Sequence, residues 1–93
     1  MDLSAVREEI RKIDLKIAEL IKARTDLAIH VYKAKKEQNF AIVDNKQVED
    51  VLRRAEEFAI ANGLNSDAMK RIFEILIEMN TDEQERFLRE GIE

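Results

Sequence analysis

The feature that most constrains the fold is a heptad pattern of apolar residues in the first third of the chain. These residues alternate in steps of three and four, with one gap of seven. They are Leu3, Val6, Ile10, Ile13, Ile17, Leu20, Leu27, Val31 and Ala34. Arg24 fills the gap and restores the alternation. With no Pro or Gly before Lys36, the pattern predicts one helix from about Asp2 or Ser4, either of which can cap it, to about Gln38.

This helix is too long for a compact domain of its own chain. At 1.5 Å per residue it spans about 50 Å, whereas a compact domain of this size has a radius of gyration of only about 12 Å. The apolar seam would therefore project into water unless a second chain covered it. We expect an intertwined helical homodimer.

Two further helices are predicted after the break at residues 39–44. Asn39 is suited to a left-handed helix end, and Asp44 to the N-cap of the second helix. Gly63 ends that helix, and Asn65 or Ser66 caps the third. The fold class is therefore all-α, with three helices, one of them very long, in a single domain over residues 1–93.

Composition limits the classes of function. The chain has 45% hydrophobic residues, no Cys and a net charge of −4. No apolar run approaches the roughly 18 residues of a membrane span, and no signal peptide opens the sequence. The expectation is a cytoplasmic protein that binds neither membrane nor nucleic acid, because nucleic-acid binders usually carry a basic excess.

Two cations lie on the apolar seam, where leucine would cost less. Lys35 follows Arg24 by eleven residues, which returns it to within about 20° of the same direction and about 16 Å along the axis. Both side chains are long enough to lean toward a ligand between them. Burial of an unpaired cation is costly, so an anionic ligand is one interpretation. A salt bridge to a carboxylate of a neighbouring helix is the alternative.

Three more polar residues are candidates for the same ligand. Arg7 lies about 25 Å before Arg24 and points about 100° away, so it could share a ligand only from a partner chain; otherwise it is a solvated surface residue. Asn80 and Gln84 lie one turn apart on one face. Their amides can hydrogen bond to an ether, hydroxyl or carboxylate, or can form a buried polar pair that determines helix register.

Other kinds of chemistry lack their residues. His30 is the single His, with no Cys or second His to form a metal site. No nucleophile set or Gly-rich phosphate loop stands out. The sequence therefore predicts a site without metal or cofactor, which binds a compact polyanion and catalyses, if at all, by positioning and electrostatic stabilisation.

The sequence resembles the all-α class of chorismate mutase over nearly its whole length. The residues that carry the resemblance are VREEIRKIDLKIAELIKART (6–25), VYKAKK (31–36), IVD (42–44) and RIFEILIEMNTDEQ (71–84). The resemblance implies an intertwined dimer with two active sites shared between chains. It also implies an isomerase of aromatic amino acid biosynthesis, which rearranges chorismate to prephenate without a cofactor.

The resemblance also implies roles for single residues. Arg24 would bind one substrate carboxylate, and Arg7 of the other chain the second. Lys35 and Gln84 would stabilise the negative charge that develops on the ether oxygen, which makes them, with Arg24, the expected catalytic residues. Asp44 would lie near the ring hydroxyl. Asn80 occupies a position at which the family has a small polar residue or Asn.

Two positions depart from the family's pattern. Gln47 and Val48 stand where the family usually has an Arg and a Glu, three and four residues after the Asp. Gln47 keeps hydrogen-bonding capacity toward the substrate but no charge, and Val48 keeps neither. Two alternatives therefore stay open: an isochorismate pyruvate-lyase-type activity, and a non-catalytic helical dimerisation or regulatory module.

Overall fold

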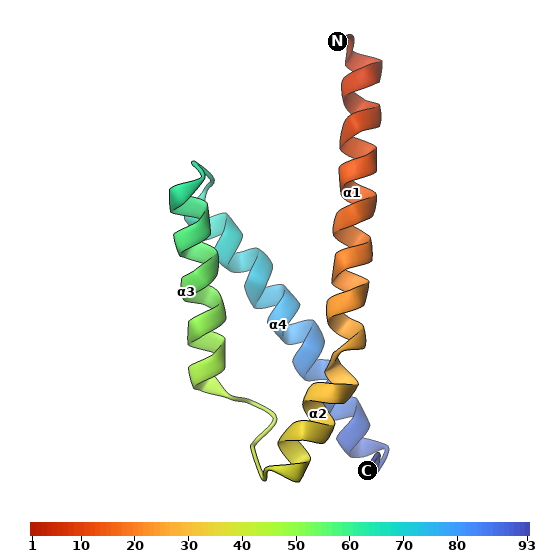
Figure 1. The fold of residues 1–93 in the computed structure, drawn as a ribbon, viewed down its shortest axis with the longest axis vertical. Coiled ribbons are helices and arrows are strands. Elements are labelled where there is room, and N and C mark those ends of the chain that lie inside the picture. The colour runs from red at the N-terminus through yellow and green to blue at the C-terminus, as the bar shows by residue number, and fades with distance from the viewer.

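A computed structural model describes residues 1–93 and consists of helices joined by short connections (Figure 1). The helices are α1 (Leu3–Asp26), α2 (Ala28–Glu37), α3 (Asn45–Ala61) and α4 (Ser66–Arg89). The predicted all-α class is confirmed. None of the helices combines the length with the apolar character that a membrane-crossing segment requires. α4 runs diagonally through the molecule and contacts each of the other three helices, whereas α3 contacts α4 alone.

The first predicted helix is bent at Leu27, which separates α1 from α2. The Thr25 hydroxyl donates to the carbonyl of Ile21 at 2.8 Å, a contact that often bends helices. The Leu27 N–H donates to the carbonyl of Arg24, three residues back, at 3.3 Å. The expectation of one uninterrupted helix is therefore wrong at this residue. The prediction of three helices holds when the bent pair α1–α2 is counted as one.

The predicted helix ends are confirmed. Asp2, Asp44 and Asn65 are the N-caps of α1, α3 and α4, and each side chain accepts a main-chain N–H three residues ahead. Asn39 and Gly63 adopt left-handed backbone conformations, with φ of 59° and 69°. Local turn chemistry thus determines where α2 and α3 end and where α3 and α4 begin.

The buried core lies where α2 and α3 pack against α4. On α3, Ala55 and Ala59 are buried one turn apart, and their small side chains let the α3 and α4 backbones approach closely. On α2, Ala28 and Tyr32 are buried, and the Tyr32 ring packs at 5.7 Å from the ring of Phe87 on α4. These contacts hold α2 and α3 on either side of the functional site described below.

By contrast, α1 has no buried residue. Its apolar seam is exposed, with Leu3 at 62% and Leu20 at 70% of full exposure, and no other helix lies beside its N-terminal part (Figure 1). The radius of gyration is 16.5 Å. The chain exposes 7257 Å², whereas a compact monomer of its mass exposes about 5,600 Å². The single chain therefore leaves a large apolar surface uncovered.

We expect Ala59→Leu to destabilise the fold by about 1–3 kcal/mol, because the added atoms cannot fit between α3 and α4 without strain. Ala61→Leu, at an exposed position on the same helix, is the matched control and should change stability by less than about 0.5 kcal/mol. Urea unfolding followed by circular dichroism measures both. Equal stabilities of the two variants would contradict close packing at Ala59.

Candidate active site

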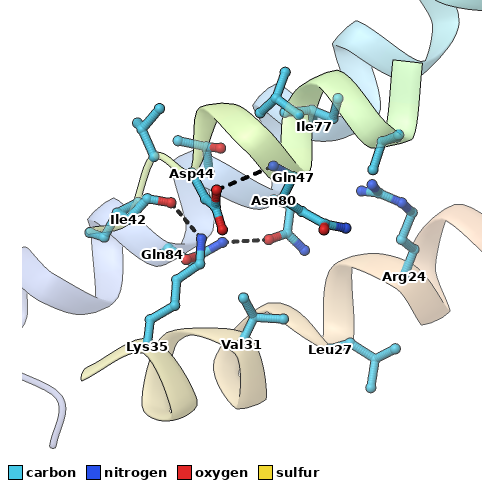
Figure 2. A pocket seen from close by; sticks show the side chains of 14 residues that line it. Arg24, Leu27, Val31, Lys35, Ile42, Asp44, Gln47, Ile77, Asn80 and Gln84 are labelled. Carbon is cyan, nitrogen blue, oxygen red and sulfur yellow. Dashed lines mark hydrogen bonds between the residues drawn. The ribbon is translucent and has the colours of Figure 1, made fainter. Parts of the chain in front are cut away.

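A pocket of about 440 Å³ opens between the end of α1, α2, the loop 38–44, the start of α3, and α4 (Figure 2). Its size is in the range of small-molecule sites. Half of the residues that line it are aliphatic. The polar ones are Arg24, Lys35, Asp44, Gln47, Asn80, Thr81 and Gln84. The pocket is thus an apolar cleft with a few convergent polar groups.

Arg24 extends from the last turn of α1 toward α4 (Figure 2). Its Nη1 donates to the main-chain carbonyl of Leu76 at 2.9 Å. Partial burial lowers the pKa of Arg24, and no carboxylate opposes that shift. The structure therefore does not support the alternative interpretation, in which Arg24 forms a structural salt bridge.

Lys35 projects from α2 into the other end of the pocket. Its ammonium group donates to the carbonyl of Ile42 in the loop before α3 and points toward Asp44 (Figure 2). Desolvation lowers the pKa of Lys35, and the charge of Asp44 opposes this only in part. Desolvation in the pocket therefore disfavours the protonated form of Lys35.

Asp44 has a structural role that limits what it offers to Lys35. Its carboxylate accepts the main-chain N–H of Gln47 at 3.2 Å and caps α3 (Figure 2). A carboxylate at a helix N-terminus is stabilised by the helix dipole. Gln47 and Val48, in the first turn of α3, both line the pocket, so the two positions that depart from the family's pattern face the site without adding charge.

Asn80 and Gln84 form the polar face of α4 in the pocket. Gln84 is 2% exposed, and its Nε2 donates to the Asn80 Oδ1 at 2.6 Å (Figure 2). The Gln84 Oε1 is buried and has no hydrogen-bond partner. An amide group carries two donor hydrogens, so Gln84 retains one N–H as well as this oxygen for a ligand. A buried polar atom without a hydrogen-bond partner destabilises the fold. This cost is consistent with a Gln84 amide that binds a ligand.

The structure brings six of the predicted site residues into this pocket: Arg24, Lys35, Asp44, Gln47, Asn80 and Gln84. Arg7 is exposed on α1 and does not line it. It lies about 25 Å from Arg24 along the helix. Within one chain, Arg7 cannot act at this site.

Sequence reasoning missed Thr81 and the carbonyl groups of Ile42 and Leu76. Thr81 lies four residues after Ile77 and three before Gln84, on the same helix face. This spacing could have predicted that Thr81 lines the pocket. The two carbonyl acceptors could not be predicted from the sequence, because every residue has a carbonyl group. Only the fold determines which carbonyl accepts a hydrogen bond from a cation.

The arrangement of polar groups in the pocket suits an anionic ligand. Two cations, one carboxylate that caps a helix, and the amides of Asn80 and buried Gln84 line a largely apolar cavity. A guest with two carboxylates would restore to the cations the electrostatic stabilisation that they lose by leaving water. No group of three or more His, Cys, Asp or Glu side chains lies where it could hold a metal ion.

Two relatives are similar to this sequence over most of its length. It is 31% identical to a bifunctional chorismate mutase/prephenate dehydratase of Escherichia coli over 90 residues, which are 97% of this chain and 23% of that protein. The chain therefore spans about a quarter of the length of such bifunctional relatives. It is also 31% identical to a chorismate mutase of Methanocaldococcus jannaschii, covering 95% of this chain and 89% of that one.

A solved structure has the same fold. A conserved hypothetical protein of Pyrococcus furiosus superposes with a TM-score of 0.71 and 41% sequence identity, over 88% of this chain and 93% of that one. The sequence profile described as chorismate mutase type II matches residues 6–85, a range that includes all six residues gathered in the pocket. The chain belongs to the chorismate mutase type II family.

Proposed function

We propose that the protein is a chorismate mutase, which rearranges chorismate to prephenate in the pocket between α1, α2, α3 and α4. The observation that carries the proposal is the partial burial of Arg24 and Lys35 in one pocket with no salt bridge to either. Chorismate carries two carboxylates and an ether oxygen. Its reaction is intramolecular and needs no nucleophile, which agrees with a pocket that offers cations and amides.

In this proposal Arg24 binds one carboxylate of chorismate. Lys35 and Gln84 approach the ether oxygen from α2 and α4, where they stabilise the negative charge that grows as the C–O bond breaks. Contacts that are stronger in the transition state than in the ground state accelerate the reaction. Asp44 and Gln47 lie toward the ring hydroxyl, and Asn80 orients the Gln84 amide through their hydrogen bond.

We further propose a homodimer whose two sites are each completed by the partner chain. The support is the exposed seam of α1, together with about 1,700 Å² of surface in excess of that of a compact monomer. A standard interface buries about 800 Å² on each partner, so the excess is ample for an intertwined dimer. Arg7 of the partner subunit would bind the second carboxylate, because Arg7 is out of reach within one chain.

The direct test is incubation with chorismate, in which we expect prephenate to form. Arg24→Leu should lower turnover by at least about 10²-fold, since the carboxylate contact that positions the substrate is lost. The same variant should fold as stably as the wild type or more stably, because it removes a desolvated cation. Absorbance at the chorismate band and thermal unfolding measure the two effects.

Arg53→Leu, on the exposed face of α3, is the matched control and should retain activity. An inactive wild-type protein would reject the mutase proposal. Pyruvate release from isochorismate by that protein would favour the lyase alternative, and inactivity toward both substrates would favour a non-catalytic module. Unfolding of Arg24→Leu would instead assign Arg24 a structural role.

We expect activity to fall at high pH, where Lys35 loses its proton. Its pKa is lowered by desolvation, and only the protonated form stabilises the ether oxygen, so kcat/KM should decline at a pH below the usual lysine range. Bound dianion raises the Lys35 pKa, so kcat should decline at higher pH than kcat/KM. In Lys35→Arg, the guanidinium stays charged, and the decline should move to higher pH. An unchanged pH profile in that variant would exclude Lys35 as the titrating group.

Shared sites predict complementation between two inactive chains. A mixture of Arg7→Ala and Arg24→Ala chains forms heterodimers in which one site keeps both arginines. Random pairing should then restore about one quarter of wild-type activity, measured after the chains are unfolded together and refolded. Mass spectrometry confirms that heterodimers are present. If verified heterodimers stay inactive, the two arginines do not meet across the dimer.

A further inference from the structure

Two side chains of α2 donate hydrogen bonds to one carbonyl group in the turn that follows α4. The Tyr32 hydroxyl on α2 donates to the carbonyl oxygen of Ile92 at 2.6 Å, and the Lys36 ammonium group donates to the same oxygen at 3.0 Å. Tyr32 is 2% exposed, and its ring packs against Phe87. These are the only side-chain hydrogen bonds between α2 and the segment formed by α4 and its C-terminal turn. We call the contact of Tyr32 with Phe87 and Ile92 the tyrosine latch.

The latch lies next to the two groups assigned to the ether oxygen. Lys35 follows Tyr32 by three residues on α2, and Phe87 follows Gln84 by three residues on α4. Residues three apart lie on adjoining parts of a helix surface, so the contact that joins Tyr32 to Phe87 also determines how far Lys35 lies from Gln84. The other contacts of Lys35 are to the loop at Ile42 and to Asp44, and neither ties α2 to α4.

The carboxylate-binding side of the pocket does not depend on the latch in this way. Arg24 lies on α1, before the bend at Leu27, and is tied directly to α4 through the carbonyl of Leu76. A small rotation of α2 about the bend would therefore move Lys35 while it left Arg24 in place. Substrate binding and transition-state stabilisation are held by separate contacts.

Gly91 makes the latch possible. It has φ of +70°, and the Ile92 N–H donates to the carbonyl of Phe87 at 3.0 Å, which is the hydrogen bond of a Schellman helix end. This turn directs the Ile92 carbonyl back toward α2. At the end of α3, Gly63 has φ of +69°, and the Leu64 N–H donates to the carbonyl of Ala59 at 2.9 Å. The two turns share one geometry, but only the turn at Gly91 meets α2.

We propose that Tyr32 is a positioning residue for the mutase reaction: through the latch to Ile92 it holds α2 on α4, so that Lys35 and Gln84 meet at one oxygen. The proposal rests on the function proposed above. It predicts that loosening the latch lowers kcat, because a displacement of Lys35 weakens a transition-state contact, and leaves KM nearly unchanged, because Arg24 keeps its place.

The test compares Tyr32→Phe, Gly91→Ala and Gly63→Ala in the full chain. Tyr32→Phe keeps the ring on Phe87 and removes the hydroxyl. The two glycine variants place the same Cβ in the same left-handed conformation, and neither Cβ meets an atom within 4 Å, so they should lower Tm by similar amounts. We expect kcat for chorismate to fall about tenfold in Tyr32→Phe and Gly91→Ala, with KM within about twofold, and Gly63→Ala to match the wild type.

The assays are run well below the lowest Tm, so that loss of folded protein does not contribute. A kcat within about twofold of that of Gly63→Ala in both latch variants would overturn the proposal, as would a KM increase as large as the fall in kcat. Failure of the wild-type protein to convert chorismate would instead reject the proposed function, and that result is read before any variant is compared.

Discussion

The constraint on which the site depends is the partial burial of two cations that the chain itself does not neutralise. Arg24 and Lys35 each donate one hydrogen bond to a main-chain carbonyl, which supplies a dipole but no negative charge. Asp44 is the single carboxylate in the pocket, and it caps α3. A structural carboxylate on Arg24 would have to be displaced by every anionic substrate. Its absence keeps the cation available, at the expense of stability in the empty protein.

The helix arrangement distributes these groups over separate elements. Arg24 lies in the last turn of α1, Lys35 lies on α2 beyond the bend at Leu27, and Gln84 lies on α4; all three line the pocket. α4 connects them, because its polar face lines the pocket while other parts of its surface pack on α2 and α3. The local irregularity at Thr25 and Leu27 lies between the residues that carry the two cations.

The two departures from the family's pattern have a definite place in this geometry. Gln47 and Val48 both face the pocket, so the charge missing at these positions is not replaced from elsewhere in α3; Lys46 is exposed and does not line the site. In the proposed dimer, Arg24 and the partner's Arg7 bind the two carboxylates of the dianion. The part of the pocket formed by the start of α3 is less polar than the family's usual Arg and Glu would make it.

The sequence by itself determined the helical segments, their caps and six of the seven polar residues that meet in the pocket. Heptad spacing, Asp and Asn caps, and left-handed positions at Asn39 and Gly63 act over a few residues and can be read directly. The tertiary structure alone decided the bend at Leu27, the choice of Ile42 and Leu76 as carbonyl acceptors, the unpartnered Gln84 Oε1 and the contact of Tyr32 with Ile92, sixty residues away. These features depend on which helix faces meet, and the packing of a whole chain determines that where local spacing does not.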